Sequence, residues 1–314
     1  MTLTIGVDVG GTKVLGGVVD EAGTVLAELR QDTPAEDASG TLATIVDVIR
    51  QLSAGREIEA VGIGAAGWID AARSTVLFAP NLAWHDEPLR DEVAAQVGLP
   101  VVVENDANVA GWAEYRFGVA EQARNMVMFT VGTGIGGAIV LDGALVRGAY
   151  GIAAEMGHVL AVPDGHQCGC GRLGCLEQYA SGRALVREAR RIAAADPANA
   201  RDLLARAGGV PERIDGPAVT AAAQAGDPAA LAAFAEIGRW LGSGIADLVQ
   251  LLDPEMVVIG GGVIEAGELL LAPVREACAA SLPQRGKLPY AEIRAAEMGQ
   301  HAGVVGASDL ARRR

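Results

Sequence analysis

Short apolar runs separated by turn residues dominate the beginning of the chain. The runs 3–9, 13–19 and 24–30 are rich in β-branched residues, which is typical of strands. A Gly-Gly-Thr turn follows the first run, and the turn DEAG follows the second. The pattern therefore predicts three strands joined by tight turns.

The middle of the chain repeats this arrangement. Its apolar runs are 126–131, 135–141 and a short one near 144–147. In both copies the turn threonine, Thr12 or Thr133, precedes the aspartate of the next turn, Asp20 or Asp142, by eight or nine residues. Two similar hairpin units predict a duplicated fold.

Helical and strand-like patterns alternate through the rest of the chain. Helices are predicted at 39–54, about 88–97, about 106–117, within 227–252 and at about 266–281, and strands at 58–65, 100–104 and 255–263. The polar stretch 195–228 contains Pro and Gly, and it predicts loops or small helices. This alternation over 314 residues predicts an α/β fold of two domains around an active-site cleft.

Composition and charge exclude several classes of partner. The formal charge of −14 argues against a nucleic-acid backbone or an anionic membrane surface, because both attract clustered Lys and Arg. No export signal precedes the first strand, and the longest uncharged run, 125–141, is shorter than the roughly 20 apolar residues of a membrane-spanning helix. We therefore expect a cytoplasmic protein with no nucleic-acid or membrane partner.

Three glycine-rich turns are candidate phosphate-binding loops. Residues 10–12 and 132–134 lie in hairpin turns, and residues 260–262 follow a strand. No Walker or Rossmann motif is present, because the order Gly-Lys-Thr is absent and a strand follows each hairpin turn. Each turn alone is equally typical of a tight turn, but the amides of all three together indicate nucleotide binding. Asp8, just before the first turn, is a candidate to hold Mg²⁺ through its waters.

The segment VVVENDAN carries the candidate catalytic residue. Asn105 and Asp106 stand where an apolar strand ends and a helix begins, a common position for functional groups in α/β sheets. Asp106 is a candidate general base for a substrate hydroxyl, with Asn105 holding that substrate by hydrogen bonds. The alternative is purely structural, because Asn and Asp are also favoured helix N-caps.

Three of the four cysteines, Cys168, Cys170 and Cys175, lie within eight positions of the chain. In a reducing compartment such spacing favours metal binding or redox chemistry over a disulfide. The spacing C-x-C-x₄-C is tighter than in an ordinary zinc ribbon, and His166 is the histidine nearest in sequence. Cys278 lies in an apolar helical segment and is interpreted as a small buried hydrophobe.

Taken together, six motifs resemble those of the ROK family of sugar kinases and regulators. They are DVGGTK at 8–13, ENDAN at 104–108, GTGIGG at 132–137, EMGH at 155–158, CGCGRLGCLE at 168–177 and VVIGGG at 257–262. The resemblance covers nearly the whole chain, and it is closest to the bacterial members that phosphorylate glucose.

The resemblance implies an actin-like (ribonuclease H-like) duplicated fold, with a carboxy-terminal helix that returns to the first domain. On this basis we expect a small α/β domain of residues 1–108 plus 301–314. A larger α/β domain of residues 109–300 would carry the cysteine loop. Relatives are commonly dimers or tetramers, so we expect a homo-oligomer.

The activity that the resemblance implies is the ATP- and Mg²⁺-dependent phosphorylation of glucose at O6, a reaction of glycolysis. Asp106 is then the general base. The implied sugar contacts are Gly67, Asn81, Asn105, Asp106, Glu155, His158 and Glu177. The implied ATP and Mg²⁺ site comprises Asp8, Gly10, Gly11, Thr12, Lys13, Gly132, Thr133, Gly134, Gly260, Gly261 and Gly262.

The resemblance also implies a bound Zn²⁺, with His158 as the fourth ligand beside the three clustered cysteines. Because four protein ligands leave no open coordination position, this zinc is expected to be structural. It would fix the loops that carry Glu155 and Glu177 and so orient both carboxylates toward the sugar.

Several alternatives stay open at this point. The acceptor sugar can be another hexose, such as N-acetylmannosamine, N-acetylglucosamine or fructose, and the phosphoryl donor can be polyphosphate. A sugar-responsive regulator is the other functional class. Regulators of this family resemble the chain but carry an added helix-turn-helix, for which we expect no room before Asp8.

Overall fold

The computed structural model describes residues 2–313, which pack as two compact units. Unit 1 comprises Met1–Val127, Ala138–Ala154 and Ala296–Arg314, and unit 2 comprises Met128–Gly137 and Glu155–Ala295. The predicted small domain, 1–108 plus 301–314, falls within the ranges of unit 1. Its boundaries as a domain stay a prediction.

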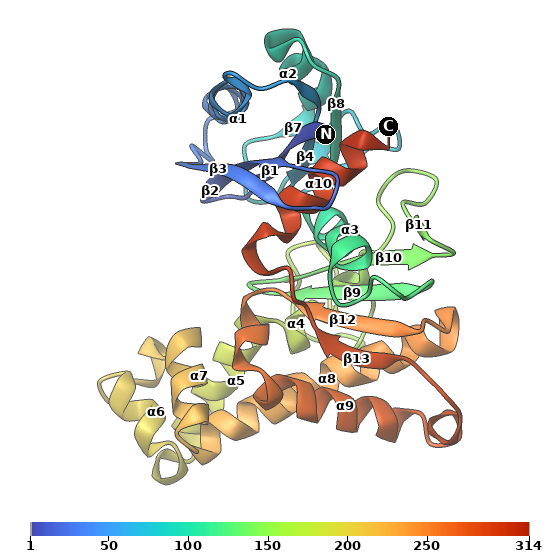
Figure 1. The fold of residues 1–314 in the computed structure, drawn as a ribbon. Helices are drawn as coiled ribbons and strands as arrows, with labels where there is room; N and C mark the ends of the chain where they lie inside the picture. Colours follow the sequence, from blue (N-terminus) through green and yellow to red (C-terminus); the bar gives the residue numbers. More distant parts are fainter. Residues whose placement is uncertain (1, 314) are drawn as a thin grey trace. The chain divides into compact units, whose positions relative to one another are not determined.

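Unit 1 is built on a five-stranded sheet of order β3-β2-β1-β4-β8 (Figure 1). The strands are β1 (Leu3–Val9), β2 (Lys13–Val19), β3 (Val25–Asp32), β4 (Ile58–Ala65) and β8 (Val101–Asn105). β1, β2 and β3 form an antiparallel series, whereas β4 runs parallel to both β1 and β8. The register pairs Val9 with Ala65 and Ala65 with Asn105, so the carboxyl ends of the parallel strands meet at one edge.

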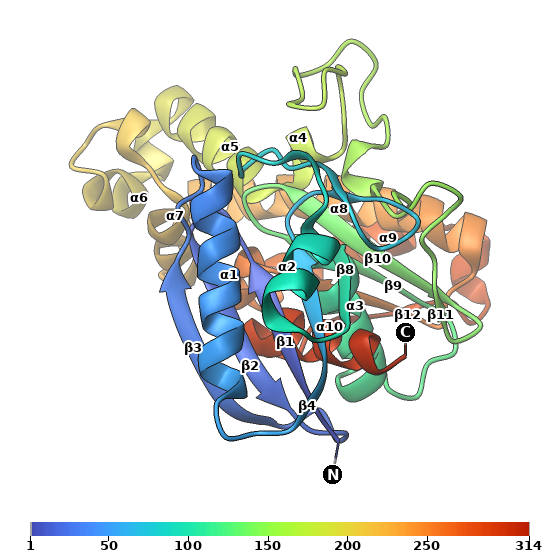
Figure 2. The ribbon, with the colours of Figure 1, turned by 90° about the horizontal axis from the view of Figure 1, so that it is seen from above.

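Helices cover both faces of this sheet (Figure 2). α1 (Ala38–Ser53) packs on the face where a side chain at Gly16 would collide with Val48. α10 (Ala302–Arg312) packs on the face where a side chain at Gly17 would collide with Val304, and it also packs on α3 (Asp106–Phe117). Because successive strand residues point to opposite faces, α1 and α10 lie on opposite sides of the sheet.

The backbone of α10 lies so close to β1 and β4 that no side chain fits between them at two strand positions. A Cβ atom at Gly6 would lie 1.8 Å from the carbonyl oxygen of Val304, and one at Gly62 would lie 1.8 Å from that of Ala307. Glycine is therefore required at both strand positions. The carboxy-terminal helix packs directly on the backbone of β1 and β4.

Three further short strands and one helix also belong to unit 1. β5 (Trp68–Ile69), β6 (Val76–Phe78) and β7 (His85–Glu87) form a separate antiparallel sheet, and α2 (Leu89–Val97) follows them. The sequence did not predict this small sheet, because strands of two or three residues are too short to show periodicity.

A second five-stranded sheet has the order β11-β10-β9-β12-β13. Its strands are β9 (Met126–Val131), β10 (Ile135–Leu141), β11 (Ala144–Leu145), β12 (Met256–Gly260) and β13 (Glu292–Ala295), and β9 and β10 contribute residues to both units. Position for position, this order repeats that of the first sheet, with three consecutive strands followed by two later ones. The predicted duplicated α/β fold is thereby confirmed.

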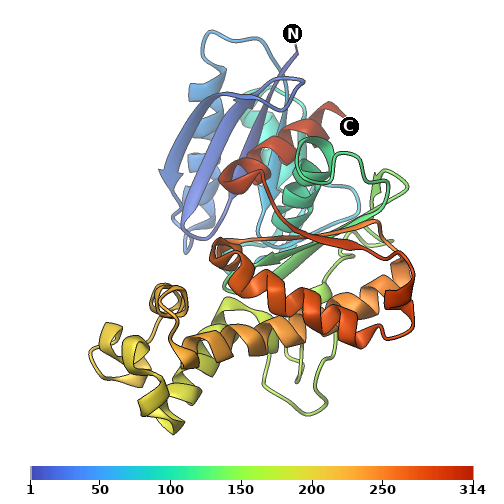
Figure 3. The ribbon, with the colours of Figure 1, turned by 60° about the horizontal axis from the view of Figure 1, so that its bottom comes forward.

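The remaining elements of unit 2 are mainly helical. The α-helices are α4 (Glu177–Ala180), α5 (Gly182–Ala195), α6 (Arg201–Arg206), α7 (Gly216–Gln224), α8 (Pro228–Leu252) and α9 (Glu268–Ser281). Short 3₁₀ helices are Met156–His158, Pro197–Asn199, Pro211–Arg213, Gly262–Ala266, Arg285–Lys287 and, in unit 1, Gly299–His301. α8 and α9 lie side by side (Figure 3), and Gly238 and Gly242 of α8 leave room for Pro273 and Val274 of α9.

Most elements predicted from the sequence are confirmed with small shifts at their ends. The predicted strand 255–263 ends at Gly260, and the predicted helix 266–281 begins at Glu268. The stretch 195–228 contains the short helices α6 and α7, and the implied carboxy-terminal helix is α10. Among the described residues, no helix combines the length and apolar character that a membrane span requires.

Substitution of Gly62 tests the packing of α10. We expect Gly62→Ala to lower the free energy of unfolding by about 3 kcal/mol, because the added methyl group must displace helix backbone rather than a side chain. Urea denaturation followed by circular dichroism measures this. Gly216→Ala is the matched control, since nothing lies within 4 Å of its added methyl group. Equal unfolding midpoints for the two variants would contradict the packing described.

Candidate functional site

Two hydrogen bonds fix the conformation of the turn between β1 and β2. The Gly10 N–H donates to the Lys13 carbonyl at 3.0 Å, and Thr33 Oγ1 donates to the Gly10 carbonyl at 2.8 Å. Thr12, at the tip, is exposed. A Cβ atom at Gly11 would lie 3.1 Å from the backbone oxygen of Asn81, so the exposed Asn81 packs over this turn.

Asp8 is a half-buried carboxyl group at the carboxyl end of β1. Burial, reinforced by the nearby charge of Asp106, raises its pKa to about 6 despite the opposing effect of Lys13. A Cβ atom at Gly303 would lie 2.8 Å from Asp8 Cγ, so the first turn of α10 packs against this carboxyl group. A single carboxylate beside the turn predicted to bind phosphates fits Mg²⁺, which proteins bind through one or two carboxylates together with substrate phosphates.

Asn105 and Asp106 make different hydrogen bonds at the junction of β8 and α3. Asn105 is the N-cap, since its Oδ1 accepts a hydrogen bond from the Asn108 N–H at 3.0 Å. Asp106 Oδ1 accepts hydrogen bonds from Asn105 Nδ2 at 3.0 Å and from the Ala107 N–H at 2.9 Å. Because neither of these donors uses Oδ2, that oxygen has lone pairs to accept a substrate proton. Asn105 therefore forms the predicted N-cap, whereas Asp106 binds the first-turn N–H of Ala107 through Oδ1.

Burial raises the pKa of Asp106, whereas the hydrogen bonds from Ala107 and Asn105 oppose that rise. A raised pKa makes the carboxylate a better proton acceptor near neutral pH. Asn105 Nδ2 also donates to the Gly67 carbonyl at 3.1 Å, so the backbone of the predicted sugar contact Gly67 lies beside the pair.

A buried ion-pair cluster that the sequence did not predict anchors this end of β8. Glu104 Oε2 lies 3.1 Å from Arg73 Nε and 2.6 Å from Arg147 Nε. Glu104 Oε1 accepts hydrogen bonds from the Asn105 N–H and from Asn108 Nδ2. The only sequence signal for this cluster is that Glu104, a charged residue, follows the apolar run VVV. Its partners could not be predicted, because Arg73 and Arg147 are distant from it in sequence.

In unit 2 the turn between β9 and β10 borders a cavity of about 790 Å³. Gly132 and Thr133 line the cavity together with residues of α5 and α7 and with Gly262. Of the other glycines predicted here, Gly134, Gly260 and Gly261 are not among the lining residues. Gly261 has a φ of 85°, and a Cβ atom on it would lie 2.5 Å from the Val131 carbonyl oxygen, so it shapes the turn behind the cavity. No local pattern predicted that α5 and α7 form walls of this cavity.

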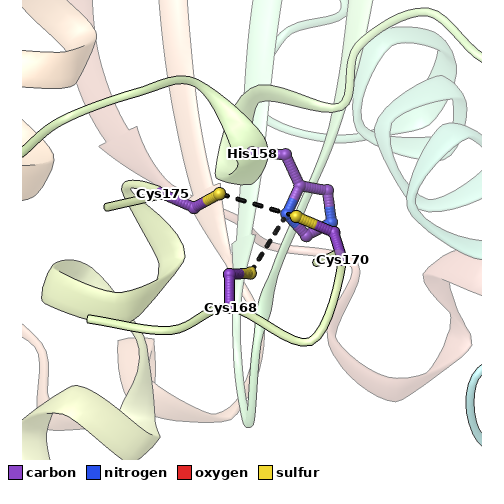
Figure 4. A group of neighbouring side chains, drawn as sticks. All are labelled: His158, Cys168, Cys170 and Cys175. Atoms are coloured by element: carbon purple, nitrogen blue, oxygen red, sulfur yellow. Dashed lines mark hydrogen bonds between the residues drawn. The ribbon is translucent and has the colours of Figure 1, made fainter. Parts of the chain in front are cut away.

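The predicted metal ligands His158, Cys168, Cys170 and Cys175 come together in unit 2 (Figure 4). Their ligand atoms all lie within 4.8 Å of one another, with Cys168 Sγ 3.6 Å from His158 Nδ1 and Cys170 Sγ 3.6 Å from Cys175 Sγ. Four ligands around a tetrahedral Zn²⁺ stand about 3.5–3.8 Å apart, so this donor set fits zinc. The rival His166 instead stacks beside Tyr179, with ring centroids 5.2 Å apart.

The two predicted carboxylates of unit 2 lie beside this cluster. His158 presents Nδ1 to the cysteines, and its Nε2 lies 3.8 Å from Glu155 Oε2. Glu177, the first residue of α4, is buried, and its Oε2 accepts a hydrogen bond from the Ile135 N–H at 3.0 Å. Gly67, Asn81, Asn105 and Asp106 belong to unit 1, whereas Glu155, His158 and Glu177 belong to unit 2.

Comparison with known proteins identifies the family. The sequence model described as "ROK family" matches residues 4–314. The chain belongs to the ROK family. Among ROK relatives, the "Glucokinase" of Streptomyces coelicolor is 49% identical over 99% of this chain and 98% of its own length. The "Glucokinase" of Thermotoga maritima is 37% identical over 99% of this chain and 97% of its own length.

A solved ROK structure is similar over the full length. It is a ROK family glucokinase from Streptomyces griseus in complex with glucose and AMPPNP, 51% identical with a TM-score of 0.89, and it covers 99% of this chain and 100% of its own. The predicted actin-like fold, which ROK sugar kinases share, is confirmed for this chain.

Removal of one cysteine ligand tests the metal centre. We expect Cys170→Ser to lower zinc affinity by more than about a hundredfold, since even an outer-shell change at such sites costs 10- to 100-fold. Zinc per chain, measured by plasma mass spectrometry after dialysis, reports this. His166→Ala is the control and retains zinc, because His166 stacks on Tyr179 instead. Loss of zinc in both variants would assign the fourth ligand to His166, and retention of zinc in Cys170→Ser would contradict the cluster described.

The pH dependence of stability tests the environment of Asp8. Because the folded-state pKa lies above the ordinary value, the folded chain binds a proton that the unfolded chain lacks, and stability falls as pH rises from about 4 to about 6. Asp8→Asn avoids this loss. We expect the ligand-free variant to be about 1–3 kcal/mol more stable than the wild type above pH 6 and equal to it below pH 4. A wild type that is the more stable of the two at pH 8 would contradict the assignment.

Proposed function

We propose that this chain is an ATP- and Mg²⁺-dependent glucokinase, which transfers the γ-phosphoryl group of ATP to O6 of glucose. The observation that carries the proposal is the Asn105–Asp106 pair. Asn105 caps α3, and Asp106 keeps an oxygen available at the carboxyl edge of the sheet. The similarity over full length to glucokinases supports the choice of substrate.

In the proposed reaction Asp106 accepts the proton of the sugar 6-hydroxyl. As the bond between O6 and the γ-phosphorus forms, the bond from that phosphorus to the bridging oxygen breaks, and ADP leaves. Asn105, Gly67 and Asn81 in unit 1, and Glu155, His158 and Glu177 in unit 2, are the proposed sugar contacts. Accurate positioning by such contacts supplies much of the rate enhancement expected for this class of reaction.

The nucleotide is proposed to bind on the glycine-rich turns. Its base and ribose would occupy the cavity lined by α5, α7 and the Gly132–Thr133 turn, and the phosphates would meet turn amides, including those of residues 10–13. Asp8 would hold Mg²⁺, which when bound supplies positive charge to the phosphates. Zn²⁺ held by His158 and the three cysteines would supply rigidity only, because these ligands fill a tetrahedral site.

Other hexoses and polyphosphate remain the alternatives for acceptor and donor. A coupled assay over glucose, N-acetylmannosamine, N-acetylglucosamine and fructose, with ATP or polyphosphate, tests the proposal directly. It predicts glucose with ATP as the preferred pair. Preference for an N-acetyl sugar would contradict the proposed substrate while leaving the kinase mechanism in place. A cytoplasmic location and a dimeric or tetrameric state stay predictions from the sequence.

Substitution of Asp106 tests its catalytic role. We expect Asp106→Asn to bind glucose with near-normal affinity but to lose roughly 10²- to 10⁴-fold in kcat, the usual contribution of a general base. Isothermal titration and steady-state kinetics together separate the two effects. Near-normal kcat in this variant would remove Asp106 from the role.

A further inference from the structure

Glu177 stands directly behind the turn formed by residues 132–134. Its Oε2 accepts the Ile135 N–H at 3.0 Å, and a Cβ atom at Gly134 would lie 2.3 Å from the same oxygen. On its other side, Oε1 lies 3.8 Å from Cys168 Sγ in the metal cluster. A buried carboxylate is thus in contact with the turn on which nucleotide phosphates are proposed to bind.

The Glu177 carboxylate repels the phosphate chain of a nucleotide bound over this turn unless its negative charge is neutralised. The Glu177 side chain is only 11% exposed, so water screens its charge weakly. A Zn²⁺ ion held by three thiolates and one neutral imidazole would give the cluster a net charge of about −1, so the loaded cluster would supply no compensating positive charge. A cation beside Glu177 is therefore needed for anions to bind over the turn.

Arg183 is that cation. Its Nη2 lies 3.3 Å from Glu177 Oε1, in the only ion pair that Glu177 makes among residues 2–313. Its Nε donates to the Thr133 carbonyl at 3.0 Å, and its side chain lines the cavity. One guanidinium group therefore contacts both the turn and the carboxylate behind it.

We propose that Arg183 is a positioning residue that neutralises Glu177 and fixes Thr133, so that the phosphate chain of a nucleotide can bind over the turn. The inference rests on the proposed function, in which a nucleotide occupies this cavity. It assigns Glu177 a second role besides sugar binding.

Arg190 provides a matched comparison. It also lines the cavity, but its Nε and Nη2 both donate to the Ile214 carbonyl, at 2.9 Å and 2.7 Å. Removing either arginine deletes one positive charge from the cavity. Only removal of Arg183 leaves the buried Glu177 without its partner.

The test is a double-mutant cycle measured by isothermal titration of the zinc-loaded chain with Mg·AMPPNP and with adenosine, in the absence of sugar. We expect Arg183→Ala to weaken Mg·AMPPNP binding roughly tenfold and adenosine binding little, because only the former carries phosphates. Adding Glu177→Gln to this variant removes the unpaired charge and should recover most of the loss. Arg183→Lys, which keeps the charge, should retain most of the affinity.

The same Glu177→Gln change in the Arg190→Ala background should give no recovery. An equal effect of Glu177→Gln in the two backgrounds would overturn the proposal, because Arg183 would then act only as a general positive charge. A loss in Arg183→Lys equal to that in Arg183→Ala would also overturn it, and this arm does not depend on how well the Glu177 variants fold. Failure of the wild type to phosphorylate glucose contradicts the proposed function alone, since no sugar enters the titrations.

Discussion

The hydrogen bond from the Asn108 N–H to Asn105 Oδ1 is the constraint on which the candidate active site depends. The first turn of a helix leaves N–H groups without backbone partners, and an N-cap Ser, Thr, Asp or Asn side chain commonly satisfies one of them. Here Asn105 is the N-cap of α3, and Asp106 accepts the Ala107 N–H through Oδ1. Glu104 anchors the same strand end through Arg73 and Arg147, and Asp106 is the proposed general base. We therefore assign a separate role to each of the three consecutive residues.

The carboxy-terminal helix connects this edge of the sheet to the other end of the chain. Glycines in β1 and β4 let α10 approach to backbone contact, and Gly303 brings its first turn against Asp8. As a result, Asp8 is buried close enough to Asp106 for the Asp106 charge to raise the pKa of Asp8. The raised pKa lowers the stability of the ligand-free fold above pH 6, and it accompanies the placement of a carboxyl group beside the turn proposed to bind phosphates.

Local patterns in the sequence predicted most of the fold, because β-branched runs and tight turns specify hairpins without distant partners. The duplication was readable from Thr12 and Thr133 and their flanking strands. By contrast, β5, β6 and β7 are too short for periodicity, and β13 has only four residues. The backbone contact of α10 with Gly6 and Gly62 could not be derived, because no local signal links strand residues to Val304 and Ala307 near the other end of the chain.

Some features of the candidate site were likewise predictable from the sequence, and others were not. The resemblance to a family selected His158 over His166, and the geometry of the cluster agrees with that choice. Nothing local distinguished Arg147 or Arg183 from the other arginines of the chain, since their partners Glu104 and Glu177 are set by tertiary packing. The motifs therefore predicted the grouping of the metal-ligand candidates, whereas the ion-pair partners of Glu104 and Glu177 became visible only in three dimensions.

The most direct measurement of the central claim is the distance from Asp106 Oδ2 to glucose O6 in a crystal structure with glucose and Mg·AMPPNP. We predict a separation of about 2.6–3.2 Å, the range for a general base and the proton it accepts. Both Asp106 oxygens turned onto backbone N–H groups of α3, away from the 6-hydroxyl, would contradict the account.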